Sequence, residues 1–184
     1  EGYSLSGWTG SNGKSYQTKV TIVKGTVGNL TYTANFSANP DTKYTVVHKY
    51  KNFAGDGFTE IVVEELSGST DSIVKPEARS VLGYANPTLK NLKITSDGNA
   101  QIEYVYERAM VTLAYSDDVL SDTPAGIYKA GTQITISAKN KVGYTFNRWN
   151  VYSNGLPTFA DNDNDGTISI GDNVIIGADW FYVI

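Results

Sequence analysis

The stretch Gly143–Tyr144–Thr145–Phe146–Asn147–Arg148–Trp149 has a near twin at the other end of the chain, Gly2–Tyr3–Ser4–Leu5–Ser6–Gly7–Trp8. Both begin with Gly-Tyr and reach Trp after four further residues. Each is followed by a polar, glycine-rich stretch and then by an alternating segment that ends in Ala-x-aromatic, Ala34–Asn35–Phe36 and Ala178–Asp179–Trp180. Self-similarity in a fixed order is the signature of a repeat architecture. The sequence therefore predicts a tandem array of small units.

A third, looser copy lies between these two, from Gly83–Tyr84 to Tyr104–Val105–Tyr106. Thr, Val, Ile, Tyr and Gly are abundant in the chain, and no long run has helical periodicity. We therefore expect a mainly β fold of the α+β type, with little helix. Because the chain starts inside a repeat and ends on a strand, it is expected to be a piece of a longer protein.

Composition excludes several function classes. The net charge of −4 and the scattered lysines give no basic stripe for a phosphate backbone, so we expect no nucleic-acid partner. No apolar run approaches the length of a membrane span, so no membrane insertion is expected. The 184 residues contain no cysteine, which excludes disulfides, thiolate metal sites and cysteine nucleophiles.

Three segments are expected, 1–39, 42–108 and 109–184. Asn39–Pro40–Asp41 is read as a linker, because Pro40 restricts Asn39 to extended conformations. The first segment has no counterpart of the strands expected at Val111–Tyr115 and Thr132–Ala138, so it is half a unit. The strands expected from period-two alternation are Tyr3–Trp8, Val20–Ile22, Leu30–Phe36, Tyr44–Tyr50, Phe58–Leu66, Leu92–Thr95, Ala100–Tyr106, Met110–Tyr115, Thr132–Ala138, Tyr144–Trp149, Thr167–Ile170 and Val174–Trp180.

Turn chemistry adds further expectations. Asp97–Gly98 is a strong type I′ turn signal, which predicts a hairpin between Leu92–Thr95 and Ala100–Tyr106. Within the second of these strands, apolar and polar residues alternate, so one face is expected to be buried and the other wet. Residues 67–80 are the best place for a short helix or an irregular crossover, and residues 117–127 could hold one helical turn.

The motif Gly-Tyr-x-Phe-x-x-Trp, followed by a strand that ends in Ala-x-Trp, resembles the internalin B-repeat (Listeria–Bacteroides repeat) family. The middle segment is similar to the related repeats of the mucin-binding-protein type, although Lys49 stands between His48 and Tyr50 where that family has the two adjacent. The resemblance implies β-grasp-like modules, each a small mixed sheet with one crossing helix. It makes 1–39 the C-terminal half of a B-type repeat, 42–108 a mucin-binding-protein-like repeat, and 109–184 a complete B-type repeat with an added acidic loop. The residues that carry the middle resemblance are Tyr44–Asn52, Asp56–Glu60, Gly83–Tyr84, Asn86–Pro87 and Tyr104–Arg108.

The same resemblance implies a function without catalysis. It places the chain outside the cell, on the surface of a bacterium, in an array that acts as a stalk or adhesive module. The implied partner is a host or matrix glycoprotein or polysaccharide. The alternative is a carbohydrate-binding accessory module of a secreted enzyme, with exposed aromatic rings and structural calcium. A monomer is expected, with a dimer through the N-terminal half-repeat as the other arrangement.

The loop from Asp161 to Asp172 fits the twelve-residue calcium-binding template. Carboxylates stand at positions one, three and five, and Gly166 stands at position six, where the turn needs positive φ. Three carboxylates at alternate positions repel one another without a cation. The alternative reading is an ordinary surface turn, since Asn, Asp and Gly favour turns for their own reasons. The expected ligands of a structural calcium ion are Asp161, Asp163, Asp165, Thr167 through its carbonyl, Ser169 through a water, and Asp172.

Other candidate residues have plainer interpretations. His48, the single histidine, is expected to be a half-exposed strand residue, because nothing local supports a catalytic triad. The fixed places of the tryptophans in the repeats favour core packing over sugar stacking. Glu64–Glu65 and Asp117–Asp118 are read as solvated charge, since adjacent strand residues face opposite ways. The aromatic residues outside the repeat frame, which are better candidates for a binding surface, are Tyr16, Tyr50, Phe53, Tyr128 and Tyr152.

Overall fold

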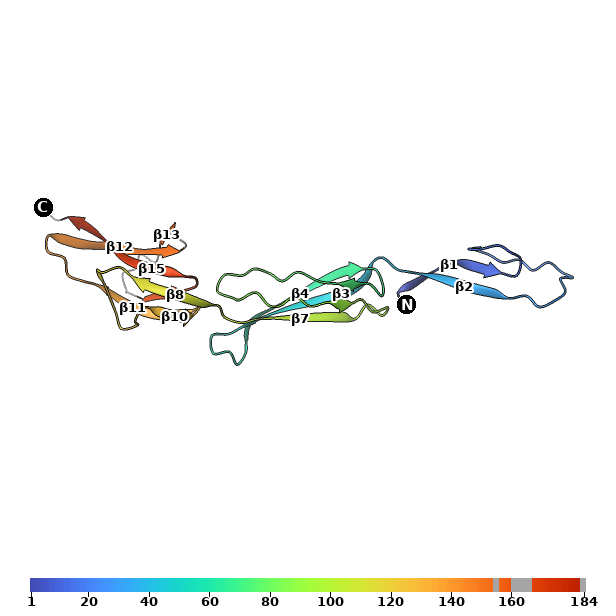
Figure 1. The fold of residues 1–184 in the computed structure, drawn as a ribbon, viewed down its shortest axis with the longest axis horizontal. Helices are drawn as coiled ribbons and strands as arrows, with labels where there is room; N and C mark the ends of the chain where they lie inside the picture. Colours follow the sequence, from blue (N-terminus) through green and yellow to red (C-terminus); the bar gives the residue numbers. More distant parts are fainter. Residues whose placement is uncertain (154–155, 160–166, 183–184) are drawn as a thin grey trace. The chain divides into compact units, whose positions relative to one another are not determined.

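The computed structural model describes residues 1–153, 156–159 and 167–182, and Figure 1 shows its strands, labelled where there is room. The described part of the chain contains strands and no helix, and therefore no helix that could cross a membrane. The expectation of a mainly β fold is confirmed. The crossing helix implied by the β-grasp resemblance and the helical turn expected in residues 117–127 are wrong for these residues, because strands β9 (Val119–Ser121) and β10 (Gly126–Lys129) form there instead.

By compactness the chain divides into two units. The first comprises Glu1–His48, Val62–Glu77 and Thr88–Tyr104, and the second Lys49–Ile61, Ala78–Pro87 and Val105–Ile184. Three of the five dividing points fall within strands β3 (Thr42–Lys51), β4 (Phe58–Gly68) and β7 (Ala100–Tyr106), so this division does not test the three segments expected from the sequence. Those boundaries stay a prediction.

The N-terminal segment is an antiparallel hairpin of β1 (Tyr3–Gly10) and β2 (Tyr32–Ala38). Pairing runs from Tyr3 opposite Ala38 to Gly10 opposite Tyr32, with a bulge between Leu5 and Gly7. The strand expected around Val20–Ile22 is wrong: this stretch is irregular, and Ile22 is exposed. Alternating apolar residues hold a strand only where a neighbouring strand satisfies their backbone groups, and these have none beside them in the described hairpin.

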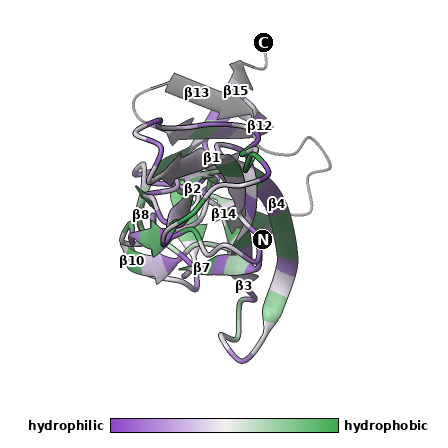
Figure 2. Ribbon diagram, turned by 90° about the vertical axis from the view of Figure 1, so that its right-hand side faces the viewer, coloured by the Kyte–Doolittle hydropathy of each residue, from purple (hydrophilic) through white to green (hydrophobic). Residues whose placement is uncertain are grey.

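The middle of the chain forms a sheet in the order β4–β3–β7. On β7 the side chains of Ala100, Ile102, Tyr104 and Tyr106 are buried and those between them are not, which confirms the expected one-sided sheet. Figure 2 shows hydrophobic and hydrophilic residues following one another along β4.

The hairpin expected around Asp97–Gly98 is wrong. A turn does form, but over Thr95–Gly98: Gly98 is its last residue, with a φ of 73° and its N–H donating to the Thr95 carbonyl over 3.1 Å. Asp97 does not have the positive φ that a type I′ turn centred on Asp97–Gly98 would need. However, β6 (Leu92–Lys93) pairs with β5 (Ile73–Val74), while β7 pairs with β3. The turn therefore connects strands of two different sheets. Residues 67–80 form the irregular crossover, with β5 as its short extended part.

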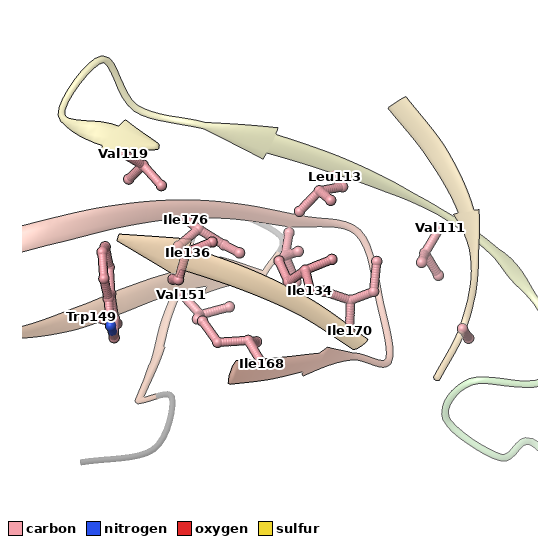
Figure 3. Packing of buried hydrophobic residues seen from close by; sticks show 12 residues of the cluster. Val111, Leu113, Val119, Ile134, Ile136, Trp149, Val151, Ile168, Ile170 and Ile176 are labelled. Carbon is pink, nitrogen blue, oxygen red and sulfur yellow. The ribbon is translucent and has the colours of Figure 1, made fainter. Parts of the chain in front are cut away.

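The C-terminal segment holds two sheets. One has the order β10–β8–β15–β12–β13 and the other β14–β11–β9. A cluster of buried residues from both sheets includes Leu113, Ile134, Trp149, Ile170 and Ile176, and Figure 3 shows these side chains gathered between the strands. The remaining bounds are β8 (Met110–Tyr115), β11 (Thr132–Ala138), β12 (Tyr144–Ser153), β13 (Leu156–Phe159), β14 (Thr167–Ile170) and β15 (Val174–Tyr182).

Candidate functional site

The acidic loop is only partly within the described residues. Asp161, Asp163 and Asp165 lie outside them, so their candidacy as ligands stays a prediction. Strand β14 begins directly after this stretch, with Thr167 opposite Thr135 and Ser169 opposite Gln133 on β11. Among the described residues, no group of three or more acidic, histidine or cysteine side chains is placed to hold a metal ion. The candidate ligands at positions seven and nine thus belong to a strand of the core sheet.

Asp172, the last residue of the calcium template, lies in the bend between β14 and β15. Its Oδ1 accepts a hydrogen bond from the backbone N–H of Asn173 over 2.7 Å, and its Oδ2 accepts one from the Ser153 hydroxyl over 3.2 Å. Asn173 in turn accepts a hydrogen bond from the N–H of Thr112 on β8, over 2.7 Å. The bend is therefore fixed to β12 and β8, and Asp172 has little freedom to turn away from its present position.

Asp172 also lines a shallow groove of about 400 Å³, formed by residues 80–84, 109–111 and 171–173. Two large apolar side chains of the groove are exposed, Leu82 at 75% and Met110 at 63%. Tyr84 is held under the Arg108 guanidinium, which lies 4.5 Å from the ring centroid. The groove combines exposed apolar side chains with a carboxylate, which is the composition of a protein contact surface rather than of a buried catalytic pocket.

A second polar cluster joins the two ends of the C-terminal repeat. The indole N–H of Trp180 donates to Asp118 Oδ2 over 2.9 Å, and the Ser116 hydroxyl donates to the same carboxylate. Burial alone would raise the pKa of Asp118, but the hydrogen bonds from Ser116, Trp180 and the backbone outweigh it and hold that pKa below its ordinary value. Asp118 is therefore an ionised anchor for Trp180.

The tryptophans expected in the core are buried to different degrees. Trp149 is 5% exposed and packs against Phe146, with 4.7 Å between ring centroids. Trp8 and Trp180 are half-buried.

The aromatic residues outside the repeat frame do not form one surface. Tyr50 is buried and stacks on Tyr106 with 4.5 Å between ring centroids, so its candidacy is wrong. Phe53 is exposed, with the Lys129 ammonium 5.4 Å from its ring centroid. Tyr128 is half-buried, and its hydroxyl donates to the Pro124 carbonyl. Tyr16 and Tyr152 are exposed, as expected of surface residues.

His48 departs from its expectation, because its side chain is fully buried. It shares the inward face of β3 with Tyr44, Val46 and Tyr50. Its Nε2 lies 3.4 Å from Glu64 Oε2 on β4, so Glu64 is not simply solvated either. The period-two register with Val46 and Tyr50 was the signal that could have placed His48 inside. A fully buried imidazole is out of reach of a substrate.

The sequence reasoning missed the exposed apolar face of the N-terminal hairpin. Leu5 is 47% exposed, Phe36 is 61% exposed and Leu30 is 40% exposed. The same hairpin also carries a groove of about 400 Å³, lined by Trp8, Thr18, Lys19, Val20, Ile22 and Tyr32. The signal for this face was in the sequence, because the first segment lacks counterparts of the strands at Val111–Tyr115 and Thr132–Ala138. Side chains that those two strands would cover are therefore left exposed in the first segment.

The comparisons with known proteins agree with the repeat pattern. A family model described as the divergent InlB B-repeat domain matches residues 1–40 and 118–183, which is more than half of the chain. Searches of curated proteins and of solved structures gave no significant match. This family occurs in bacterial surface proteins and is typically non-catalytic. The chain belongs to the divergent InlB B-repeat family.

Proposed function

We propose that this chain is an extracellular, non-catalytic repeat region of a bacterial cell-surface protein, acting as a stalk and adhesion module that binds a host or matrix glycoprotein. The observation that carries the proposal is the family match at both ends of one chain, on two copies of the same hairpin. Arrays of small repeats provide extended surfaces for binding. The buried position of His48 fits a role without acid–base catalysis.

The groove beside Asp172 is the best candidate contact for such a glycoprotein. Leu82 and Met110 offer exposed apolar area there, and the neighbouring carboxylate offers hydrogen-bond acceptors. A carbohydrate-binding accessory module is less well supported. Sugar platforms use flat, parallel aromatic faces, whereas the exposed rings of Tyr144 and Tyr182 meet edge to face at 64°.

Binding of the chain to immobilised mucin, to a matrix glycoprotein and to a purified bacterial polysaccharide tests the proposal. We expect binding to at least one glycoprotein, weakened in Leu82→Asp/Met110→Asp. Val142→Asp is the matched control, since Val142 is 94% exposed and lies outside the groove. Binding to the polysaccharide alone would favour the accessory-module function. Binding to none of the three would leave the stalk role and remove the adhesive one.

The acidic loop is proposed as a structural calcium site, with Asp161, Asp163, Asp165, Thr167, Ser169 and Asp172 as ligands. The support comes from the template spacing and from the way the C-terminal end of the loop is held in the fold. Asp172 accepts a hydrogen bond from Ser153. Ile168 and Ile170 of β14 are buried. An ion held there would stabilise the closing half of the repeat. A melting temperature that depends on calcium is the expected signature.

A further inference from the structure

The two copies of the Gly-Tyr-x4-Trp hairpin agree residue by residue. Trp8 stands opposite Ala34 in the first copy, and Trp149 stands opposite Ala178 in the second. Each hairpin has a bulge at the same place, between Leu5 and Gly7 in one and between Phe146 and Arg148 in the other. The second copy therefore shows which surfaces of the hairpin are covered when a repeat is complete.

In the complete repeat, the opening half, residues 109–138, covers the closing hairpin, which is formed by β12 and β15, in two ways. Strand β8 adds to the edge of β15 in parallel, with Val174 to Ile176 opposite Leu113 to Tyr115, and the Ser116 N–H donates to the Ile176 carbonyl over 2.8 Å. Strand β11 places Ile134 and Ile136 in the cluster that contains Trp149, and it also pairs with β14. Figure 3 shows Ile136 and Ile176 beside Trp149.

The same surfaces are open in the first copy. By the shared register, Tyr32 corresponds to Ile176, and Leu30, two residues before β2 begins, falls at the place of Val174 when this register is continued along the chain. Leu30 is 40% exposed, whereas Val174 is 7% exposed. Within the described residues the first sheet consists of β1 and β2 alone. A groove beside Trp8 is lined by Val20 and Ile22, whereas the corresponding Trp149 shares a buried cluster with Ile134 and Ile136 of β11.

The backbone at this edge is arranged to accept a strand. Thr31 exchanges hydrogen bonds with Ser11: its N–H donates to the Ser11 hydroxyl over 2.7 Å, and its carbonyl accepts from the Ser11 N–H over 3.0 Å. Alternate residues of a strand direct their polar groups to opposite sides, so those of Leu30 and Tyr32 point to the open edge. An open edge beside an apolar groove is the geometry of strand addition.

We propose that this face of the N-terminal hairpin binds the opening half of another B-type repeat, a segment with the strand pattern of residues 109–138. Its first strand pairs in parallel with Leu30–Tyr32, and its later strand inserts aliphatic side chains into the Trp8 groove. This inference does not depend on whether the region is adhesive.

A second copy of this chain is a poorer occupant. The opening half of a second copy is already packed in its own repeat, through β8 and β11. If that opening half moved onto the N-terminal hairpin of another chain, it would expose the closing hairpin of its own repeat. The total apolar area buried would therefore not increase. The occupant is therefore an opening half without a closing hairpin of its own.

The test is a titration of the isotopically labelled 184-residue chain with an unlabelled synthetic peptide of residues 109–138, followed by amide hydrogen exchange. We expect binding to protect the amides of Leu30 and Tyr32 by about tenfold or more, as for any amide taken into a sheet. The indole resonance of Trp8 should shift at the same time. Amides of Val174 to Ile176 should not change, because they are already paired.

Matched variants control the result. Leu30→Asp should abolish the protection, whereas Val27→Asp, at a residue 90% exposed and outside the hairpin ladder, should bind the peptide as the unchanged chain does. A peptide with Leu113→Asp and Ile134→Asp should not bind. No protection at millimolar peptide, equal binding by Leu30→Asp, or changes confined to Val174–Ile176 would each overturn the proposal. Dimerisation of the chain alone that Leu30→Asp abolishes would assign the face to a second copy instead.

Discussion

Trp8 and Trp149 occupy one position in two copies of the same hairpin, but their surroundings differ. Trp149 is 5% exposed within the C-terminal cluster, whereas Trp8 is half-buried beside an open groove. We expect Trp149→Ala to lower the free energy of unfolding of the C-terminal repeat by about 3–5 kcal/mol, the usual range for removal of a buried Trp. Trp8→Ala should lower the free energy of unfolding by less than this, because part of the Trp8 side chain is already exposed. Denaturant unfolding monitored by near-ultraviolet circular dichroism measures both, and equal losses would contradict this account.

Asp118 gives a prediction of pH dependence. Its pKa in the folded chain lies below the ordinary value of 3.8. A depressed pKa means that the ionised carboxylate stabilises the fold at pH values above 3.8, and that this contribution is lost as the pH falls through the lower folded value. We expect Asp118→Asn to be less stable than the unchanged chain at neutral pH, with the difference shrinking below about pH 4.

Thermal melts of both chains between pH 2.5 and 7 check this expectation. Asp117→Asn is the matched control, because the hydrogen bonds described for the polar cluster at Trp180 are made by the Asp118 carboxylate and not by that of Asp117. A difference between Asp118→Asn and the unchanged chain that stays constant across this range would mean that the carboxylate charge is not what stabilises the contact.

At the scale of elements, two buried tyrosines of β7 hold the irregular crossovers in place. The Tyr104 hydroxyl donates to the Pro76 carbonyl over 2.7 Å, and the Tyr106 hydroxyl accepts from the Arg79 N–H over 2.8 Å. Tyr104→Phe should lower the free energy of unfolding by about 1 kcal/mol, and by more if the Pro76 carbonyl is left without a hydrogen-bond donor. Hydrogen exchange should quicken in residues 76–90 while β7 itself stays protected. Unchanged exchange in the crossover would contradict the role given to this hydroxyl.

The closing element of the C-terminal repeat carries the calcium prediction. We expect the melting temperature of the C-terminal repeat to rise with calcium, because an ion that binds only the folded state stabilises it by about 2.7 kcal/mol at a hundredfold excess over Kd. Asp163→Asn should weaken this response, whereas Asp122→Asn, outside the loop, should not. Equal melting temperatures in calcium and in chelator, with no ion bound, would reduce the acidic stretch to a surface turn.

The elements also show what the sequence could and could not predict. Strands such as β11 and β12 were predicted because alternation and a nearby partner agree. Val20–Ile22 alternates equally well, yet it is irregular, because strand formation depends on a distant segment that the first copy does not have. Asp97–Gly98 marked the place of a turn, since turn chemistry is local, but it predicted neither the type of turn nor which strands pair. The acidic loop is a similar case, because residue spacing alone predicts its calcium ligands. Of these ligands, Asp172 is the one whose side chain the structure describes.

At the scale of the whole molecule, stability should be distributed unevenly between the copies of the repeat. The C-terminal copy has a core drawn from two sheets, whereas the N-terminal copy is a two-stranded hairpin with exposed Leu5 and Phe36. A two-stranded hairpin is marginal by itself in water. Its base, however, is attached to the middle segment, where the Thr70 hydroxyl donates to the Gly2 carbonyl over 2.6 Å.

We therefore expect amide exchange in three levels. Amides of β1 and β2 near the turn, at Thr9 and Thr33, should exchange by local opening with little protection, and those near Gly2 should be protected more. Amides at Trp149 and Ile176 should exchange only by unfolding of the C-terminal repeat, since local openings reach buried central strands least. Trp149→Ala should lower protection in the C-terminal copy and leave the N-terminal hairpin unchanged. Uniform protection along the chain, or loss of protection in both copies from this one substitution, would show that the copies unfold as a single cooperative unit and that the first hairpin is already complete.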